Sequence, residues 1–224
     1  GTLGKDELRA FLDDALESAR LLASNADRAA RLVKSFKLVA VDQSSDQRRR
    51  FDLAHYMEET LRNLRPALQD RPLGTYLDCP VGIEMDTYPG PLAQVLTNLV
   101  INATQSAFAE GEAGTITLSA RREGEDEVLI SCADNGRGVP DDIRERIFEP
   151  FFTTRRASGG SGLGLYLAYT LVTQKLEGTI GVESAPEGGA VFWLRLPRAH
   201  PGGSSLTDAM RFRTDGQFNE SRQG

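Results

Sequence analysis

The sequence predicts an α+β fold in which helices cover one face of a largely antiparallel sheet. Three observations indicate this class: short segments alternate between apolar and polar residues, strongly apolar helical segments follow breaker residues, and strand-like segments occur in pairs without a helix between them. A doubly wound parallel sheet requires strands and helices to alternate regularly. The pattern therefore favours a two-layer α/β sandwich with a mixed sheet.

The composition is that of a globular chain. Of its 224 residues, 40% are hydrophobic and 26% are charged, which argues against a disordered chain, a collagen and a disulfide scaffold. The net charge of −6 argues against nucleic-acid binding, and no apolar stretch is long enough to cross a membrane. The two cysteines, Cys79 and Cys132, are expected to be buried reduced thiols in a cytoplasmic protein. Any membrane contact would be made by segments outside this sequence.

The first part, residues 1–45, is expected to form one long helix from about Asp6 to Val41. Two apolar series recur every seven residues: Leu8, Ala15, Leu22, Ala29 and Phe36, and Leu12, Ala19, Ala26, Val33 and Ala40. They form a narrow heptad seam. The seam could pack on its own domain or, as we favour, join an intermolecular helical bundle, most simply a homodimer. The polar residues 42–50 predict a linker.

The second part, residues 46–197, contains the predicted sandwich. Helices are expected at 53–68, 92–108 and 162–176, and strands at 75–79, 82–86, 115–122, 128–134, 179–184 and 190–196. Arg71-Pro72 would end the first helix, and Pro89-Gly90-Pro91 would precede the second. The third part, residues 198–224, is polar and rich in small residues, and predicts a flexible tail.

Two carboxamides stand out on the second helix of the sandwich. Asn98 and Asn102 are four residues apart, so they share one face of an otherwise apolar helix. Buried carboxamides need partners, and their oxygens suit Mg²⁺ shared with phosphates and water. Alternatively, both side chains satisfy nearby backbone groups.

A second candidate follows the predicted strand 128–134. Asp134 begins the sequence Asp-Asn-Gly-Arg-Gly, so its carboxylate would lie at a strand end and could accept a hydrogen bond from an adenine amino group. Gly136 and Gly138 permit positive φ or a close approach of the backbone to a ligand. The alternative is a plain turn.

The third and fourth candidates are adjacent. Residues 147–154 (IFEPFFTT) are expected to form a packed plug, since they hold three phenylalanines around a proline. The basic, glycine-rich loop 155–165 then enters a helix, and its amides and arginines could bind a polyphosphate. It has neither Walker A nor dinucleotide-fingerprint spacing, and it could also be a flexible surface loop.

Taken in order, the four segments resemble the N, G1, F and G2 boxes of the ATP-binding domain of bacterial sensor histidine kinases. These belong to the GHKL superfamily with its Bergerat fold, which also contains DNA gyrase B and MutL. The resemblance covers about residues 51–197. The sequence FFTT and the short loop look closest to the nitrogen-regulator-like branch, and the long first helix resembles the second helix of a dimerisation and phosphotransfer hairpin.

The resemblance implies ATP and Mg²⁺ as ligands. Asn102 would bind the metal, Asn98 would contact metal-bound phosphate or water, and Asp134 would read adenine. Residues 153–161 would form the ATP lid, whose Arg155 or Arg156 would neutralise the γ-phosphate. The implied catalytic residues are Asn98, Arg155 and Arg156, and the implied nucleotide contacts are Asn98, Asn102, Asp134, Gly136, Gly138, Phe148, Thr153, Thr154, Gly160, Ser161, Gly162, Leu163 and Gly164. Gln105 and Ser106 depart from the residues common there in many sensor kinases, which puts a phosphate contact from this turn in doubt.

The resemblance also separates a kinase from a hydrolase. ATP-hydrolysing relatives carry a general-base glutamate at the position of Asn98, and a carboxamide cannot accept a proton. The phosphoacceptor motif is absent, because neither His55 nor His200 is followed by an acidic residue. We therefore expect transfer to a histidine outside this chain and relay to a response regulator. The alternatives are a serine kinase or ATPase of the same superfamily, and a non-catalytic nucleotide-binding dimer scaffold.

Overall fold

The computed structural model describes residues 11–20, 22, 47–69, 71–155, 160–185 and 188–199. The elements of the sandwich are β1 (Arg49–Asp52), α2 (Leu53–Leu68), β2 (Leu73–Asp78), β3 (Glu84–Thr87), α3 (Pro89–Ser106), β4 (Gly114–Glu123), β5 (Glu127–Asp134), η1 (Asp141–Ile143), η2 (Arg146–Phe148), α4 (Gly164–Thr170), η3 (Leu171–Lys175), β6 (Thr179–Ser184) and β7 (Ala190–Pro197). In the part of the chain described, no helix combines the length and the apolar character needed to cross a membrane.

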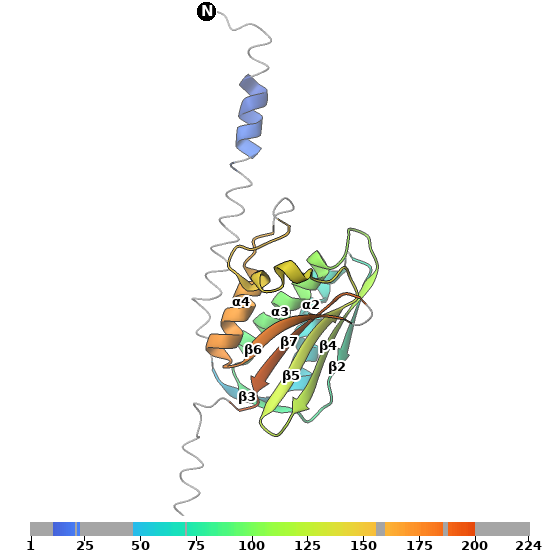
Figure 1. Cartoon of the computed structure of the whole chain (residues 1–224), viewed down its shortest axis with the longest axis vertical. Helices are drawn as coiled ribbons and strands as arrows, with labels where there is room; N and C mark the ends of the chain where they lie inside the picture. The colour runs from blue at the N-terminus through green and yellow to red at the C-terminus, as the bar shows by residue number, and fades with distance from the viewer. Residues whose placement is uncertain are drawn as a thin grey trace, which may run out of the picture.

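A five-stranded sheet forms one layer of the domain. Its strand order is β2-β4-β5-β7-β6, with β2 parallel to β4 and every other neighbouring pair antiparallel. Figure 1 shows α2 and α3 lying side by side behind this sheet, as the second layer. The predicted α+β sandwich with a largely antiparallel sheet is confirmed.

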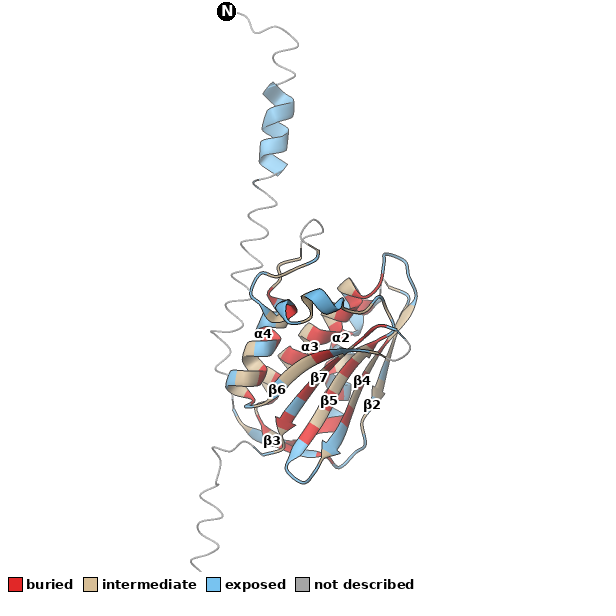
Figure 2. Ribbon diagram, viewed as in Figure 1, coloured by how far each residue is buried: buried red, intermediate tan, exposed pale blue. Residues whose placement is uncertain are grey.

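The core lies between these two layers. Along β5, Val128, Ile130, Cys132 and Asp134 are buried while the residues between them are not, which is the period of two expected for a strand with one covered face. The register places Leu118 of β4 and Phe192 of β7 on either side of Cys132. Figure 2 shows the same alternation along the central strands. Cys132 is a free buried thiol as expected, whereas the free Cys79 is only partly buried.

Helix α3 is the central helix of the second layer. Its core face includes Leu92, Leu96 and Leu99, which are at most 1% exposed. The helix begins at Pro89, so the prediction that Pro89-Gly90-Pro91 precedes it was wrong. Proline is tolerated in the first helical turn because its missing N–H would have no intrahelical partner there.

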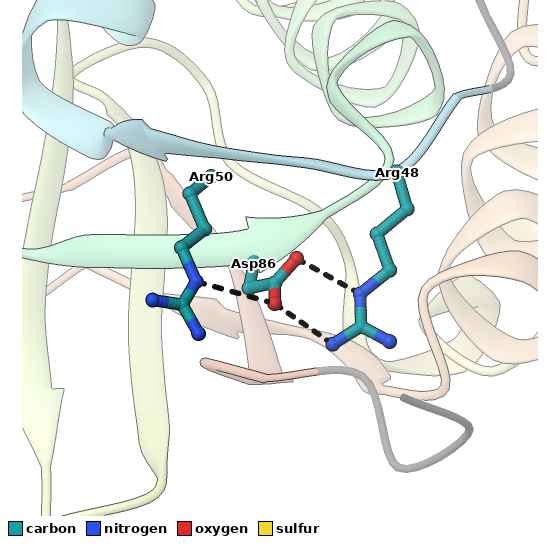
Figure 3. A network of polar contacts seen from close by, with 3 residues as sticks. All are labelled: Arg48, Arg50 and Asp86. Carbon is teal, nitrogen blue, oxygen red and sulfur yellow. Dashed lines mark hydrogen bonds and ion pairs between the residues drawn. The ribbon is translucent and has the colours of Figure 1, made fainter. Parts of the chain in front are cut away.

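The strand β1 corrects the predicted linker. Arg49 and Arg50 pair with β3, and Arg48 makes two 2.9 Å hydrogen bonds to the Asp86 carboxylate. Arg50 Nε lies 3.6 Å from the same carboxylate, so two arginines meet one aspartate (Figure 3). These cations were interpreted as linker residues because their acidic partner lies far away in the sequence.

Two further segments differ from the predictions. The expected helix 162–176 is α4 followed by η3, a π-helical segment over Leu171–Lys175. Arg198 and Ala199, expected in the tail, lie beside β3, where Asp86 N donates to Arg198 O. Residues 11–20 are helical and exposed. Except for residue 22, the rest of the predicted 6–41 helix lies outside the described residues, as do the tail from residue 200 and His200.

Candidate nucleotide-binding site

The two asparagines lie on α3 as predicted and do not bond to backbone groups. Asn98 Oδ1 accepts a 3.2 Å hydrogen bond from Gln94 Nε2, and Asn102 Oδ1 accepts one of 3.5 Å from Ser106 Oγ. Asn98 Nδ2 is buried and has no hydrogen-bond partner among the described residues. Since an unpaired buried amide costs free energy, this atom is a donor that a ligand would satisfy.

Asp134 ends β5 and is 6% exposed. Its Oδ1 accepts hydrogen bonds from Gly136 N at 3.0 Å and Ala190 N at 3.3 Å. Within the described part of the chain, no donor is found for Oδ2. Burial raises the pKa of the carboxyl above its ordinary value, although the two backbone N–H groups act to lower it. The result is a fixed, buried acceptor with one oxygen available.

The loop after Asp134 packs against the C-terminal end of α3. Arg137 N donates to Ala107 O at 2.9 Å, and a Cβ at Gly136 would lie only 2.3 Å from the same oxygen. Only a glycine at position 136 allows this contact, which joins the Asp134 segment to the asparagine helix. A plain turn would not need this contact, so the alternative does not explain the glycine at position 136.

A second close approach lies between Gly138 and Gly189. Gly138 has φ +73°, and its Cβ would lie 2.9 Å from Gly189 O. Gly189 has φ +91°, and its Cβ would lie 1.9 Å from Asp134 O. The turn between β6 and β7 is thereby pressed against the loop of Asp134, which explains how Ala190 N reaches the carboxylate.

The phenylalanine segment packs as a plug, as predicted. The Phe148 ring lies 5.9 Å from that of Tyr169 on α4 and 6.5 Å from that of Phe192 on β7, in an edge-to-face arrangement. Arg146 lies over the Phe152 ring at 4.8 Å. Phe151 is half-exposed with φ 65°, an unusual conformation for a non-glycine residue. This segment fixes the start of the lid to the core.

The two ends of the lid are held together. Arg155 N donates to Thr153 Oγ1 at 3.0 Å, and Gly160 N donates to Arg155 O at 2.9 Å. A Cβ at Gly160 would lie 2.6 Å from Thr153 Oγ1. Gly162 has φ +69°, and its Cβ would lie 2.5 Å from the Phe151 carbonyl carbon. Both glycines are therefore required by close packing, independently of any ligand.

The remaining lid residues are partly described. Ser161 Oγ accepts from Leu163 N at 3.4 Å, Leu163 is buried, and Gly164 begins α4. Thr154 is exposed. The candidate Arg156 lies outside the described residues.

Three contacts of the site were not predicted from the sequence. Arg155 donates from a guanidinium NH group to Gln105 Oε1 at 3.0 Å, Gln94 contacts Asn98, and Ala190 contacts Asp134. Helical spacing of four residues could have indicated Gln94. No local signal could have indicated the other two, because each joins segments at least 50 residues apart.

The described residues hold no group of three or more His, Cys, Asp or Glu side chains arranged to bind a metal ion. The carboxamide oxygens of the α3 face are instead the hard ligands available to a cation that retains water and phosphate. The C-terminal half of α3 thus meets the Asp134 loop at Ala107 and the lid at Gln105. This arrangement brings a segment with a buried carboxylate acceptor and a segment with a guanidinium to the same end of one helix.

Comparisons with known proteins agree with this geometry. Residues 87–200 match the family described as histidine kinase-, DNA gyrase B-, and HSP90-like ATPase. The chain is 34% identical over 185 residues to the sensor histidine kinase ZraS of Klebsiella oxytoca, an alignment that covers 82% of this chain and 38% of that kinase. The chain therefore spans well under half of the length of this relative.

Two solved structures show a similar fold. The nucleotide-free catalytic domain of histidine kinase ThkA is 25% identical with a TM-score of 0.59, over 68% of this chain and 98% of that one. Full-length ShkA in complex with AMPPNP is 27% identical with a TM-score of 0.62, over 89% of this chain and 40% of that one. The shared fold and the sequence match lead to one conclusion: the chain belongs to the family of histidine kinase-, DNA gyrase B- and HSP90-like ATPases, as a catalytic ATP-binding domain of the sensor histidine kinase type.

Proposed function

We propose that this chain is the catalytic region of a two-component sensor histidine kinase that transfers the γ-phosphate of ATP to a histidine outside the chain. One observation carries the proposal: the helix that bears Asn98 and Asn102 is joined at its C-terminal end to the loop after the buried Asp134, through Ala107, and to the lid, through Gln105. A purine and a polyphosphate are the ligand parts that these two sides would bind.

We assign adenine recognition to Asp134. Because its Oδ1 already accepts two backbone N–H groups, its Oδ2 can accept a hydrogen bond from the exocyclic amine of adenine. Guanine presents a carbonyl oxygen at that position and would be rejected. Gly136 and Gly138 keep the backbone around this pocket close to α3 and to the β6–β7 turn.

The phosphates would be bound by α3 and the lid. Asn102 would hold Mg²⁺, Asn98 Nδ2 would donate to phosphate or to metal-bound water, and Arg155 or Arg156 would neutralise the γ-phosphate. When bound, Mg²⁺ would supply charge neutralisation and alignment of the triphosphate. We assign the nucleotide contacts to Asn98, Asn102, Asp134, Gly136, Gly138, Phe148, Thr153, Thr154, Gly160, Ser161, Gly162, Leu163 and Gly164. The FFTT sequence supports a place in the nitrogen-regulator-like branch.

The side chain at position 98 favours transfer over hydrolysis. Asn98 cannot take a proton from water, so the nucleophile must be a group that needs no base there. An imidazole nitrogen meets this requirement: its bond to the γ-phosphorus forms as the bond to the leaving ADP oxygen breaks. His55 is exposed on α2 with its Nδ1 3.6 Å from Asp52, and we do not assign it this role.

The partners follow from the same proposal. We propose a homodimer through the first helix, where the described residues Phe11, Leu12 and Leu16 are more than half exposed. A response regulator receiver domain would accept the phosphate, and the domain would act in the cytoplasm, where ATP is present.

Calorimetric titration with a non-hydrolysable ATP analogue tests the proposal. We expect Mg²⁺-dependent binding that is lost in Asp134→Ala and retained in Asp126→Ala, a control at an exposed aspartate. A GTP analogue should not bind. Equal binding of both analogues, or full affinity in Asp134→Ala, would contradict the assignment of adenine recognition. Steady ATP hydrolysis by the chain alone would contradict the role given to Asn98.

A further inference from the structure

The contact between Gln105 and Arg155 joins α3 to the lid, and the Gln105 side chain has no assigned role in nucleotide binding. Gln105 lies on the last turn of α3, three residues after Asn102, and its side chain is exposed. Its Oε1 accepts a 3.0 Å hydrogen bond from the guanidinium of Arg155, which lies 50 residues away in the lid. An exposed residue that makes a long-range contact to a cation is not needed for folding the core. The contact therefore calls for a functional explanation.

Two hydrogen bonds hold the backbone of Arg155 in place. Its N–H donates to Thr153 Oγ1, and its carbonyl accepts from Gly160 N. The glycine cannot be replaced without a clash, because its Cβ would lie 2.6 Å from Thr153 Oγ1 and 3.1 Å from Arg155 O. With the backbone held in this way, the hydrogen bond to Gln105 helps to position the guanidinium.

The chemistry of a glutamine suits this task. A neutral carboxamide oxygen takes one of the five N–H donors of a guanidinium and leaves its charge intact. A glutamate would form an ion pair and cancel the charge that a phosphate requires. The helical spacing of three residues places Gln105 on the same side of α3 as Asn102. The guanidinium is thereby directed to the polar face of the helix while remaining a full cation.

We propose that Gln105 is a positioning residue that holds the Arg155 guanidinium beside the α3 asparagines, where it meets the terminal phosphate of ATP. This inference rests on the proposed function. Gln105 acts through Arg155 and makes no phosphate contact of its own. Its removal should therefore weaken ATP more than ADP, and it should have no effect once Arg155 is gone.

A double-mutant cycle with calorimetry tests this inference. Gln105→Ala should weaken binding of the ATP analogue about threefold to tenfold, as expected for the loss of one solvent-exposed hydrogen bond, and change ADP affinity less than about twofold. In the Arg155→Ala background, Gln105→Ala should change neither affinity. The isosteric Gln105→Glu should weaken ATP at least as much as Gln105→Ala. Gln174→Ala, at an exposed glutamine in η3, is the matched control.

A second measurement needs no nucleotide. Trypsin must bind the Arg155 side chain to cleave after it, so the hydrogen bond to Gln105 has to break first, and cleavage after the neighbouring Arg156 serves as an internal reference. Mass spectrometry of the fragments should show the ratio of the first cleavage to the second rise about threefold or more in Gln105→Ala, in proportion to the hydrogen bond lost.

Each outcome bears on a different claim. A wild-type chain that binds no nucleotide would refute the proposed function, and with it the role of Gln105. A chain that binds ATP with the same affinity in Gln105→Ala, or an effect that persists without Arg155, would overturn only the inference. An unchanged cleavage ratio would also overturn it, because the hydrogen bond would then not hold the side chain.

Discussion

Replacing Gly136 by alanine tests the contact that joins the Asp134 loop to α3. The new Cβ would lie 2.3 Å from Ala107 O and 2.6 Å from Ala107 Cβ, whereas real Cβ atoms stay beyond 3.0 Å. The loop must therefore move by at least about 0.7 Å. Ala107 O belongs to the end of a helix and has little freedom to give way, so the loop takes most of the displacement.

The expected cost follows from three contributions. Forcing a methyl group into a packed site costs about 2 kcal/mol. The displacement also weakens the 2.9 Å hydrogen bond from Arg137 N to Ala107 O, which is worth about 1 kcal/mol. Alanine lowers the conformational entropy of the unfolded chain, which stabilises the folded protein by about 0.7 kcal/mol. We expect the free energy of unfolding to fall by about 2 kcal/mol.

Nucleotide affinity should fall as well, because Gly136 N is one of the two donors that hold Asp134 Oδ1. A loss of about tenfold corresponds to about 1.4 kcal/mol. Urea unfolding can be followed by the fluorescence of Trp193, the single tryptophan of the chain. The control is Gly74→Ala, whose Cβ would meet only the movable Tyr76 ring edge, at 3.0 Å. If Gly136→Ala were as stable as Gly74→Ala and bound ATP normally, the argument from this contact would be refuted.

Three further substitutions test the electrostatics and the core. Burial raises the pKa of Asp134, so the stability that this group contributes is present below its ordinary pKa of 3.8 and is lost as the pH rises through the raised value. Asp134→Asn should remove this loss and raise the melting temperature at pH 7 while it abolishes ATP binding; parallel pH profiles of melting temperature in the two proteins would contradict this. The hydrogen bonds and charge of Arg48 lower the pKa of Asp86, so its contribution is present above 3.8 and is lost as the pH falls through the lowered value. Asp86→Asn should cost about 1 kcal/mol at pH 7 by urea unfolding and less at pH 3, and a pH-independent difference would argue against the ion pair. Leu96→Ala, at a fully buried position, should cost about 2–5 kcal/mol by urea unfolding, whereas the exposed Val81→Ala should cost under about 0.5 kcal/mol; similar losses in both would be inconsistent with the core assignment.

Sequence patterns located the regular elements well wherever the determining interactions are local. The bounds of α2 and of β6 agree with the expected 53–68 and 179–184. The start of α2 has a local cause, since Asp52 caps it by accepting from His55 N. The start of α3 was misplaced because a proline signals both a break and a first helical turn, and sequence alone does not separate the two.

These sequence patterns do not predict charged edge strands. The strand β1 begins with two arginines, which resemble a solvated linker until their partner is known. Asp86 lies more than thirty residues later, and only the folded chain brings it to Arg48. The pairing of β1 with β3 therefore depends on the tertiary structure.

The candidate site divides in the same way. The amino-acid sequence alone specifies the chemical groups: two carboxamides one helical turn apart, a carboxylate at a strand end and a basic glycine-rich lid. Local spacing suffices for that, because helix and strand periods are fixed by backbone geometry. The contacts of Ala190 with Asp134, of Gly136 with Ala107 and of Gln105 with Arg155 depend on the folded chain. These contacts join segments far apart along the chain, and they exist only once the core between the sheet and α3 has packed.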